Sequence, residues 1–181
     1  MFIISSSYYF NTNNKHMIET KINMGQEIPV HVNLGNASRW IRPFALEVCT
    51  GEGYDIGCTT EEWSLPGSIP IDPALNSKYN ALNLPDGEVD YIFSSHCLEH
   101  CDNWVNTLRY WTSKLKSGGV LFLYLPHYDK VSWRPWINFT HNHILTPKYI
   151  EEFLNFEGIY RKIFVSQRDL NYSFAAMCEK E

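Results

Sequence analysis

The sequence lacks the features that would place the protein in a membrane or on a nucleic acid. No apolar run approaches the roughly 20 residues that a helix needs to cross a bilayer. No stretch concentrates lysine and arginine, and the formal net charge is −5. The N-terminus has no basic segment and too short an apolar core for a signal peptide. We therefore expect no membrane span and no nucleic-acid partner.

The cysteine positions do not suggest a disulfide framework. The chain has five cysteines, an odd number, and their spacing shows no regularity. They are Cys49, Cys58, Cys97, Cys101 and Cys178. Such a set is typical of reduced thiols, so we expect a cytoplasmic protein.

The overall composition is that of a globular protein. Hydrophobic residues make up 44% and charged residues 19% of the 181 residues. This length is sufficient for one domain with a sizeable core. Residues 1–36 are polar and only weakly periodic. We therefore predict a lead-in segment over residues 1–36 and a single domain over residues 37–181.

The apolar residues alternate between helical and extended patterns. Helices are predicted over residues 38–48, 103–116 and 147–154, with Gly118 and Gly119 ending the second and Thr146 capping the third. Strands are predicted over residues 53–57, 68–72, 89–94 and 120–125, followed by an antiparallel pair at residues 159–166 and 173–178. This order predicts an α/β fold with a doubly wound, mostly parallel sheet and a C-terminal antiparallel hairpin.

Two adjacent stretches carry the main functional signal. Residues 90–100 read Asp-Tyr-Ile-Phe-Ser-Ser-His-Cys-Leu-Glu-His, and residues 115–126 contain a Lys-Ser-Gly-Gly break before an apolar strand. Together they resemble the second half of the class I, Rossmann-like S-adenosylmethionine-dependent methyltransferases, specifically the type 11 branch. The resemblance is good over residues 53–125 and loose over residues 146–180. It implies S-adenosylmethionine as cofactor and S-adenosylhomocysteine as product, but it does not indicate the methyl acceptor.

The resemblance also implies which residues bind the cofactor, beyond the carboxyl ends of the strands. The turn at residues 55–59 would approach it closely, and Asp72 would accept hydrogen bonds from the ribose hydroxyls. Asn80 would meet the adenine, and His96 would lie near the methionine part. The full predicted set is Asp55, Gly57, Cys58, Thr59, Asp72, Pro73, Asn80, Ala81, Leu82, Ser95 and His96.

A second way to align the sequence with the family's glycine-containing cofactor turn stays open. Residues 46–53 also resemble this motif, with Glu47 in the place of Asp55. The longer spacing from Glu47 to Asp72 would accommodate a full crossover helix, whereas the spacing from Asp55 fits a compact variant without that helix. We prefer Asp55 because a Pro-Gly pair interrupts the intervening segment.

Four histidines are candidates for a general base that deprotonates the acceptor. A histidine of near-neutral pKa is the usual choice for this role. His127 comes first because it directly follows the last parallel strand; His96, His141 and His143 come next. The loop over residues 128–144 would either cover the acceptor or pack as an apolar cover on the sheet edge. Its candidate contact residues are Trp133, Arg134, Trp136 and Phe139.

The same histidines allow a metal interpretation. His96 and His100 are four residues apart, as are Cys97 and Cys101, and this is a spacing that zinc ligands use on a helix. His127, His141 and His143 form a second candidate group. However, the methyltransferase branch carries a similar His-x-Leu-Glu-His turn without metal, and free cysteines usually pack as small apolar groups. We therefore predict no metal site.

The leading function is methyl transfer to a small-molecule or glycan acceptor, in a pocket that a second copy or a partner subunit could complete. The alternative is a catalytically inactive cofactor-binding or scaffold module. It is suggested by an eroded cofactor turn, with Thr59 where a glycine is expected and Asn80 where the family more often has aspartate. A nicotinamide oxidoreductase is a third alternative, and the glycine spacing counts against it.

Overall fold

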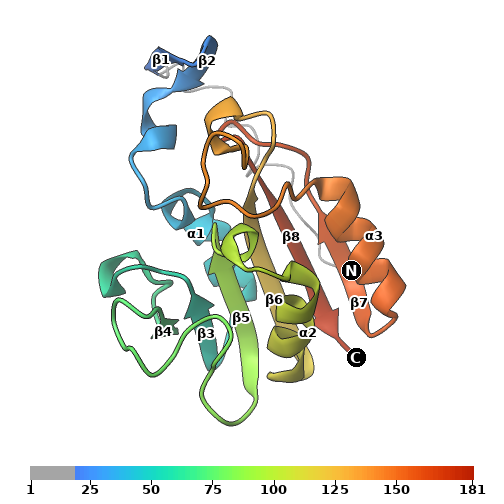
Figure 1. Ribbon diagram of the computed structural model, residues 1–181. Helices are drawn as coiled ribbons and strands as arrows, with labels where there is room; N and C mark the ends of the chain where they lie inside the picture. Colours follow the sequence, from blue (N-terminus) through green and yellow to red (C-terminus); the bar gives the residue numbers. More distant parts are fainter. Residues whose placement is uncertain (1–18) are drawn as a thin grey trace.

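The structure is a computed structural model that describes residues 19–181, and its centre is a mixed six-stranded sheet (Figure 1). Neighbouring strands from β4 to β6 run parallel, whereas β8 runs antiparallel to both β6 and β7. The α/β prediction with a C-terminal antiparallel hairpin is thus confirmed. The strands in spatial order are β4 (Ile69–Ile71), β3 (Gly53–Ile56), β5 (Val89–Ser95), β6 (Leu115–Pro126), β8 (Ser173–Lys180) and β7 (Tyr160–Val165).

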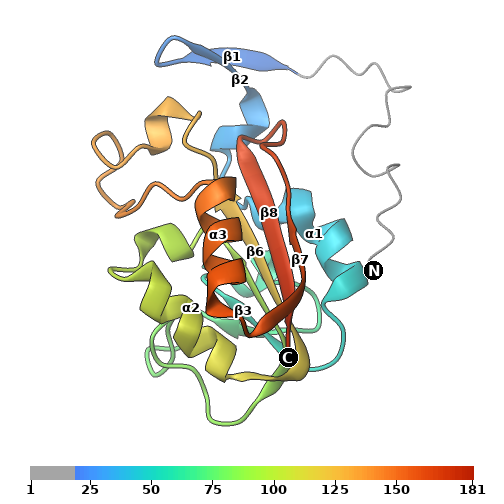
Figure 2. The ribbon, with the colours of Figure 1, turned by 90° about the vertical axis from the view of Figure 1, so that its right-hand side faces the viewer.

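Helices cover both faces of this sheet. Figure 2 shows α2 (Trp104–Ser113) and α3 (Pro147–Glu157) on one face and α1 (Ser38–Val48) on the other. Successive strand residues point to opposite faces, so each face has its own apolar cluster. Ile92 packs with the cluster under α2 and α3, whereas Phe93 packs with the cluster under α1. All five cysteines are free thiols, as expected.

The connection between β3 and β4 is compact and contains no crossover helix. Only one short 3-10 turn, η3 (Glu61–Trp63), interrupts it. Leu65 anchors this connection by burying its side chain in the cluster under α1. The sequence prediction that this segment is too short and too broken for a helix is correct.

The predicted end of the second helix is wrong. α2 ends at Ser113, and β6 begins at Leu115, which pairs with Val89 of β5. Gly118 and Gly119 therefore lie inside the strand, where the pairing of β5 with β6 shifts its register. Gly118 has a φ of +79°, so its conformational freedom serves this irregularity and not a helix C-cap.

The described part of the predicted lead-in segment is a hairpin that docks on the domain. It comprises β1 (Thr20–Asn23), β2 (Gln26–Pro29) and the 3-10 turn η2 (Val30–Asn33); residues 1–18 lie outside the described chain. The Gln26 amide donates to the Asp129 carbonyl and accepts from the Val131 amide, at 2.5 and 2.7 Å. No helix within residues 19–181 is both long and apolar enough to cross a membrane.

Candidate active site

A cleft opens at the carboxyl ends of β3 and β5, where α1 begins. This edge is where ligands bind in open α/β sheets. The cleft has a volume of about 390 Å³ and is partly open to solvent. Its lining consists of Asn36, Ala37, Ser38, Asp55, Gly57, Cys58, Thr59, Trp63, Ser95 and His96. Six of the predicted cofactor-binding residues are therefore gathered here: Asp55, Gly57, Cys58, Thr59, Ser95 and His96.

Gly57 shapes the turn that follows β3. Its φ is +85°, and a Cβ at this position would lie 2.5 Å from the Cys97 Cβ, so a larger residue is excluded. Thr59 also has a positive φ, +64°, which is strained for a residue with a β-branched side chain. The Thr59 amide donates to an Asp72 carboxylate oxygen at 3.0 Å, and this hydrogen bond fixes the turn.

Asp55 is buried at the base of the cleft, with only 1% of its surface exposed. Its carboxylate accepts a 2.6 Å hydrogen bond from the Leu65 amide, which ties β3 to the compact connection. Burial raises the pKa of Asp55 to about 7, although the hydrogen bond from Leu65 works against this shift. Glu47, the acid of the alternative register, lies exposed on α1 and does not line the cleft.

Asp72 does not itself line the cleft, but its carboxylate accepts hydrogen bonds from backbone amides, one of them in the cleft turn. One carboxylate oxygen accepts from the Thr59 amide and the other from the Ala74 amide, at 3.0 and 2.9 Å. Since a carboxylate oxygen has two lone pairs, each oxygen retains one acceptor site toward a ligand.

The predicted adenine-side residues are not among those that line the cleft. The Asn80 side chain accepts from the Leu82 amide at 2.8 Å, in a local turn, and 61% of Leu82 is exposed. Ala81 instead packs near α2, where its carbonyl accepts from the Trp111 indole at 2.7 Å. Pro73 does not line the cleft either.

Four cleft residues come from outside the methyltransferase-like motifs and were not predicted from the sequence. Asn36, Ala37 and Ser38 enter at the start of α1, and Trp63 enters from η3. The Ser38 hydroxyl hydrogen-bonds both the Asn36 side chain and the Trp63 carbonyl, so these two segments form one wall. The predicted start of a helix at residue 38, shortly before the first strand, was the available signal.

A second, smaller pocket of about 230 Å³ lies under the loop at residues 128–144, here called the aromatic loop. Trp133 and Arg134 line it, whereas 61% of Trp136 and 85% of Phe139 is exposed. The expected cover therefore holds for the first two residues and not for the last two. The full lining is Pro126, His127, Tyr128, Trp133, Arg134, His141, His143, Ile144 and Leu145.

The ring nitrogens of His127 and His143 have different hydrogen-bond partners. His127 Nδ1 accepts from the Asp129 amide at 3.2 Å, so in the neutral ring the proton lies on Nε2. His143 Nε2 lies 2.8 Å from the Cys101 carbonyl and 3.1 Å from the Asp102 carbonyl. Because carbonyls only accept, His143 Nε2 carries the proton and its Nδ1 keeps a free lone pair.

His96 lies at the contact between the cleft and the pocket. Its ring packs edge-on against Trp133, with ring centroids 5.0 Å apart, and its Nε2 lies 2.9 Å from the Ser173 hydroxyl. Burial, with smaller contributions from His141 and His100, lowers the pKa of His96 to about 3. The imidazole is therefore neutral at pH 7 and a weak proton acceptor.

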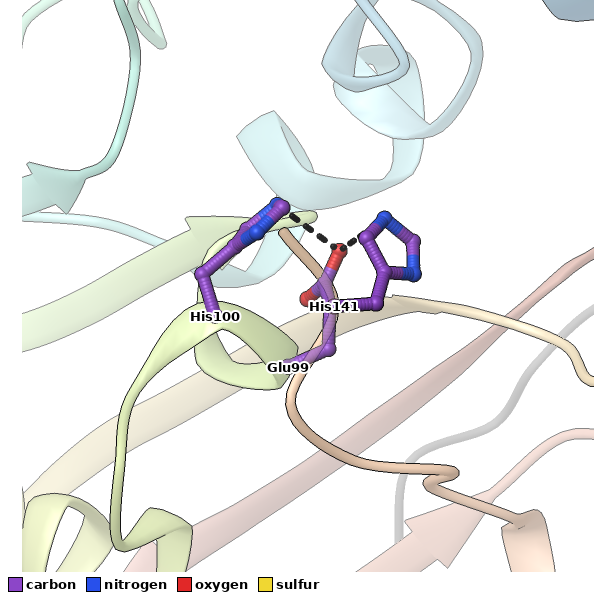
Figure 3. A group of neighbouring side chains, drawn as sticks. All are labelled: Glu99, His100 and His141. Atoms are coloured by element: carbon purple, nitrogen blue, oxygen red, sulfur yellow. Dashed lines mark ion pairs between the residues drawn. The ribbon is translucent and has the colours of Figure 1, made fainter. Parts of the chain in front are cut away.

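Glu99 brings together two histidines that the sequence analysis placed in separate groups. Figure 3 shows the Glu99 carboxylate between His100, its neighbour on η4 (Leu98–His100), and His141 of the aromatic loop. Burial raises the pKa of Glu99 to about 8 and lowers that of His141 to about 4. Although these groups lie within ion-pair distance, at pH 7 the contact between Glu99 and His141 joins neutral groups.

The comparison with known families identifies the class of protein. Residues 34–158 match the family described as a methyltransferase domain. The match covers more than half of the chain, which therefore belongs to this family. No curated protein matches the chain.

Solved methyltransferases share the fold. An S-adenosylmethionine-dependent methyltransferase from Archaeoglobus fulgidus is 19% identical in sequence and superimposes with a TM-score of 0.55. The match covers 79% of this chain and 92% of that one. The N-methyltransferase NodS from Bradyrhizobium japonicum, solved with S-adenosylhomocysteine, is 14% identical with a TM-score of 0.58 over 84% and 91%. A Haloferax volcanii methyltransferase, solved with the Trm112 methyltransferase activator, is 12% identical with a TM-score of 0.57 over 79% and 91%.

The family match and the fold agree on the activity. The protein is an S-adenosylmethionine-dependent methyltransferase with a Rossmann-like fold, which confirms the predicted enzyme class and cofactor.

Proposed function

We propose that the protein methylates a small-molecule or glycan acceptor that binds in the pocket under the aromatic loop. The supporting observation is that the cleft and this pocket adjoin. His96 lines the cleft, Trp133 lines the pocket, and their rings are in contact. A methyl donor in the cleft and an acceptor in the pocket would therefore approach each other at this point. We also assign the chain to the type 11 branch, on its residues 94–100.

The cofactor would occupy the cleft, which lies at the carboxyl ends of the parallel strands. In this proposal the open acceptor sites of Asp72 receive the ribose hydroxyls, and Gly57 lets the backbone approach the ligand. Ser95 and His96 border the methionine part. Asp55 lies at the base of the cleft and ties β3 to the compact connection through the Leu65 amide.

Bound S-adenosylmethionine supplies an activated methyl group, so the residues of the chain mainly align the acceptor and exclude water. The aromatic loop, with Ile144 at its end, and the neighbouring Leu145 line the pocket and would exclude water from it. Trp133 offers a flat face for a sugar or an apolar ring, and Arg134 offers a guanidinium for a carboxylate or phosphate.

An acceptor that must lose a proton needs a base in this pocket. We assign this role to His143, because two backbone carbonyls hold its Nε2 proton and leave the Nδ1 lone pair available. His127 was the first candidate from the sequence, but its Nδ1 lone pair already accepts from the Asp129 amide. His127 then serves as a hydrogen-bond donor through Nε2.

The test measures S-adenosylhomocysteine release with panels of small amines, alcohols, carboxylates and isolated glycans. We expect turnover with at least one such panel, and a kcat about 10²–10⁴-fold lower in His143→Gln, partly recovered at high pH. His31→Asn is the matched control, because His31 hydrogen-bonds Asn171 and lines neither cavity. Turnover restricted to protein substrates would contradict the acceptor class. An unchanged kcat in His143→Gln would contradict the base assignment.

We propose further that a second copy or a partner subunit completes the acceptor pocket. The pocket is smaller than most ligand sites, and Trp136 and Phe139 stand exposed on the loop that forms it. One similar methyltransferase was solved with an activator subunit.

A further inference from the structure

The carboxylate of Glu99 lies among imidazole nitrogens that come from different segments of the chain. Its Oε1 is 3.6 Å from His100 Nε2 and 3.9 Å from His141 Nε2. His96 Nδ1 approaches the same oxygen to 3.9 Å. Figure 3 shows that the side chains of Glu99, His100 and His141 converge on one point between η4 and the aromatic loop.

Glu99 is buried without a partner for its carboxylate. The residue has no exposed surface, and within residues 19–181 no other residue hydrogen-bonds either carboxylate oxygen. Buried carboxylates normally pair with a cation or accept several hydrogen bonds, since burial removes their hydration. An unpartnered carboxyl group that faces imidazole nitrogens fits a cation site, where binding of the cation would release the carboxyl proton.

His100 is oriented as a metal-binding histidine is. His100 Nδ1 lies 2.6 Å from the Thr140 carbonyl and must donate to it, so His100 Nε2 presents its lone pair beside Glu99. Metal-bound histidines typically use their second nitrogen in this way, to fix the tautomer and the ring orientation.

Hydrogen bonds that do not involve the three ligand side chains hold the two halves of the group together. The amide of Asn142 donates to the Glu99 carbonyl at 2.8 Å, and its side chain donates to the His100 carbonyl at 2.7 Å. His143 adds the hydrogen bond to the Cys101 carbonyl. These bonds place His141 beside Glu99, so the three ligand atoms are pre-arranged within 4.8 Å of one another.

We propose that Glu99, His100 and His141 bind a divalent transition-metal ion, for which zinc is the best fit. Two imidazoles and one carboxylate are a ligand set that zinc uses, with bonds of about 2.0–2.2 Å to nitrogen and oxygen. Tetrahedral ligands at that distance stand roughly 3.3 Å apart. The two separations from Glu99 are 3.6 and 3.9 Å, and all three ligand atoms lie within 4.8 Å of one another, so side-chain movements of up to about 1.5 Å would reach it.

The ion would link the aromatic loop to η4 through His141 on one side and Glu99 and His100 on the other. The site lies beside both the cleft and the acceptor pocket. Three ligands from the chain leave a fourth position, which His96 Nδ1 borders. This proposal differs from the sequence-based expectation of no metal. It draws one ligand from each of the two histidine groups that the sequence suggested, and it adds Glu99. Metal binding does not depend on the identity of the methyl acceptor.

The test uses the full chain, stripped with a chelator, dialysed and then titrated with Zn²⁺. We expect close to one zinc per chain by elemental analysis, and a higher melting temperature with zinc than without it. In Co²⁺-loaded protein we expect the visible absorption of a tetrahedral centre. Glu99→Gln and His141→Asn should each weaken zinc binding more than about 100-fold, beyond the usual cost of losing an outer-shell partner.

Two further variants keep the proposal open to refutation. His100→Asn changes an exposed residue, so it tests the site even if a variant of buried Glu99 does not fold. His31→Asn, outside the group, should keep full zinc binding. Zinc well below one per folded wild-type chain would overturn the proposal. So would zinc binding that survives Glu99→Gln or His100→Asn and is lost instead in Cys101→Ser.

Discussion

At the scale of the residue, Asp55 makes the stability of the protein depend on pH. Its pKa is raised from 3.8 to about 7 by burial, so between these values the folded chain holds a proton that the unfolded chain has released. Stability from this group is complete below pH 3.8 and is lost as the pH rises through about 7. The loss is at most about 1.4 kcal/mol per pH unit within that window.

Asp55→Asn isolates this contribution, because asparagine resembles the protonated carboxyl group and can still accept from the Leu65 amide. Urea unfolding at pH values from about 4.5 to about 7 lies between the unfolded and folded pKa values of Asp55. Over this range we expect the free energy of unfolding to fall more steeply for the wild type than for the variant. Equal slopes in the two proteins would mean that Asp55 is charged in the folded state.

Gly57 offers a second residue-scale prediction, with a matched control in Gly67. Both have a positive φ, +85° and +87°, but an added Cβ meets Cys97 at Gly57 and open space at Gly67. Gly67→Ala should therefore cost only the backbone strain, about 1 kcal/mol. Gly57→Ala should cost clearly more and also weaken S-adenosylhomocysteine binding. Similar unfolding energies for the two variants would contradict the close packing of the cofactor turn.

At the scale of the element, the sequence predicted a helix correctly where its ends are set by capping residues. The Thr146 side chain caps α3 by accepting from the Tyr149 amide, and Gly158 ends the helix with a φ of +67°. The end of α2 was predicted wrongly because Leu115 continues the helical spacing. Its pairing with Val89 in the sheet is a tertiary interaction that outweighs this local pattern.

The N-terminal hairpin is an element whose contacts the sequence did not predict, since a polar segment carries no periodic signal. The two hydrogen bonds of Gln26 hold the start of the aromatic loop. Gln26→Ala should speed amide hydrogen exchange at residues 129–134, with Gln167→Ala, at an exposed position, as control. Unchanged exchange in Gln26→Ala would show that the hairpin does not restrain the loop.

At the scale of the whole molecule, the sequence motifs located one wall of the site. The turn after β3 and the end of β5 lie where parallel strands must bring them, so Gly57 and His96 could be predicted. The wall made by Ser38 and Trp63 could not, because it depends on how α1 and η3 pack. Likewise, Glu99 and His141 are far apart in sequence and meet only through the path of the aromatic loop.

The residues in and around the cleft also bear on whether it binds the cofactor. Thr59, in a strained conformation where a glycine is expected, is the feature that favours a module without activity. Against it stand the six predicted residues that line the cleft and the open acceptor sites of Asp72. The cleft therefore agrees with the methyltransferase activity that the family match assigns.

The most direct test of this account is calorimetric titration of the full chain with S-adenosylmethionine and S-adenosylhomocysteine. We predict saturable binding at one site per chain, lost in Asp72→Ala and kept in Asp86→Ala, an exposed acid away from the cleft. At about 100 times the dissociation constant, the ligand should add about 2.7 kcal/mol of stability and raise the melting temperature by roughly 5–11 °C. A folded wild-type chain that binds neither compound would contradict the account and leave the scaffold interpretation.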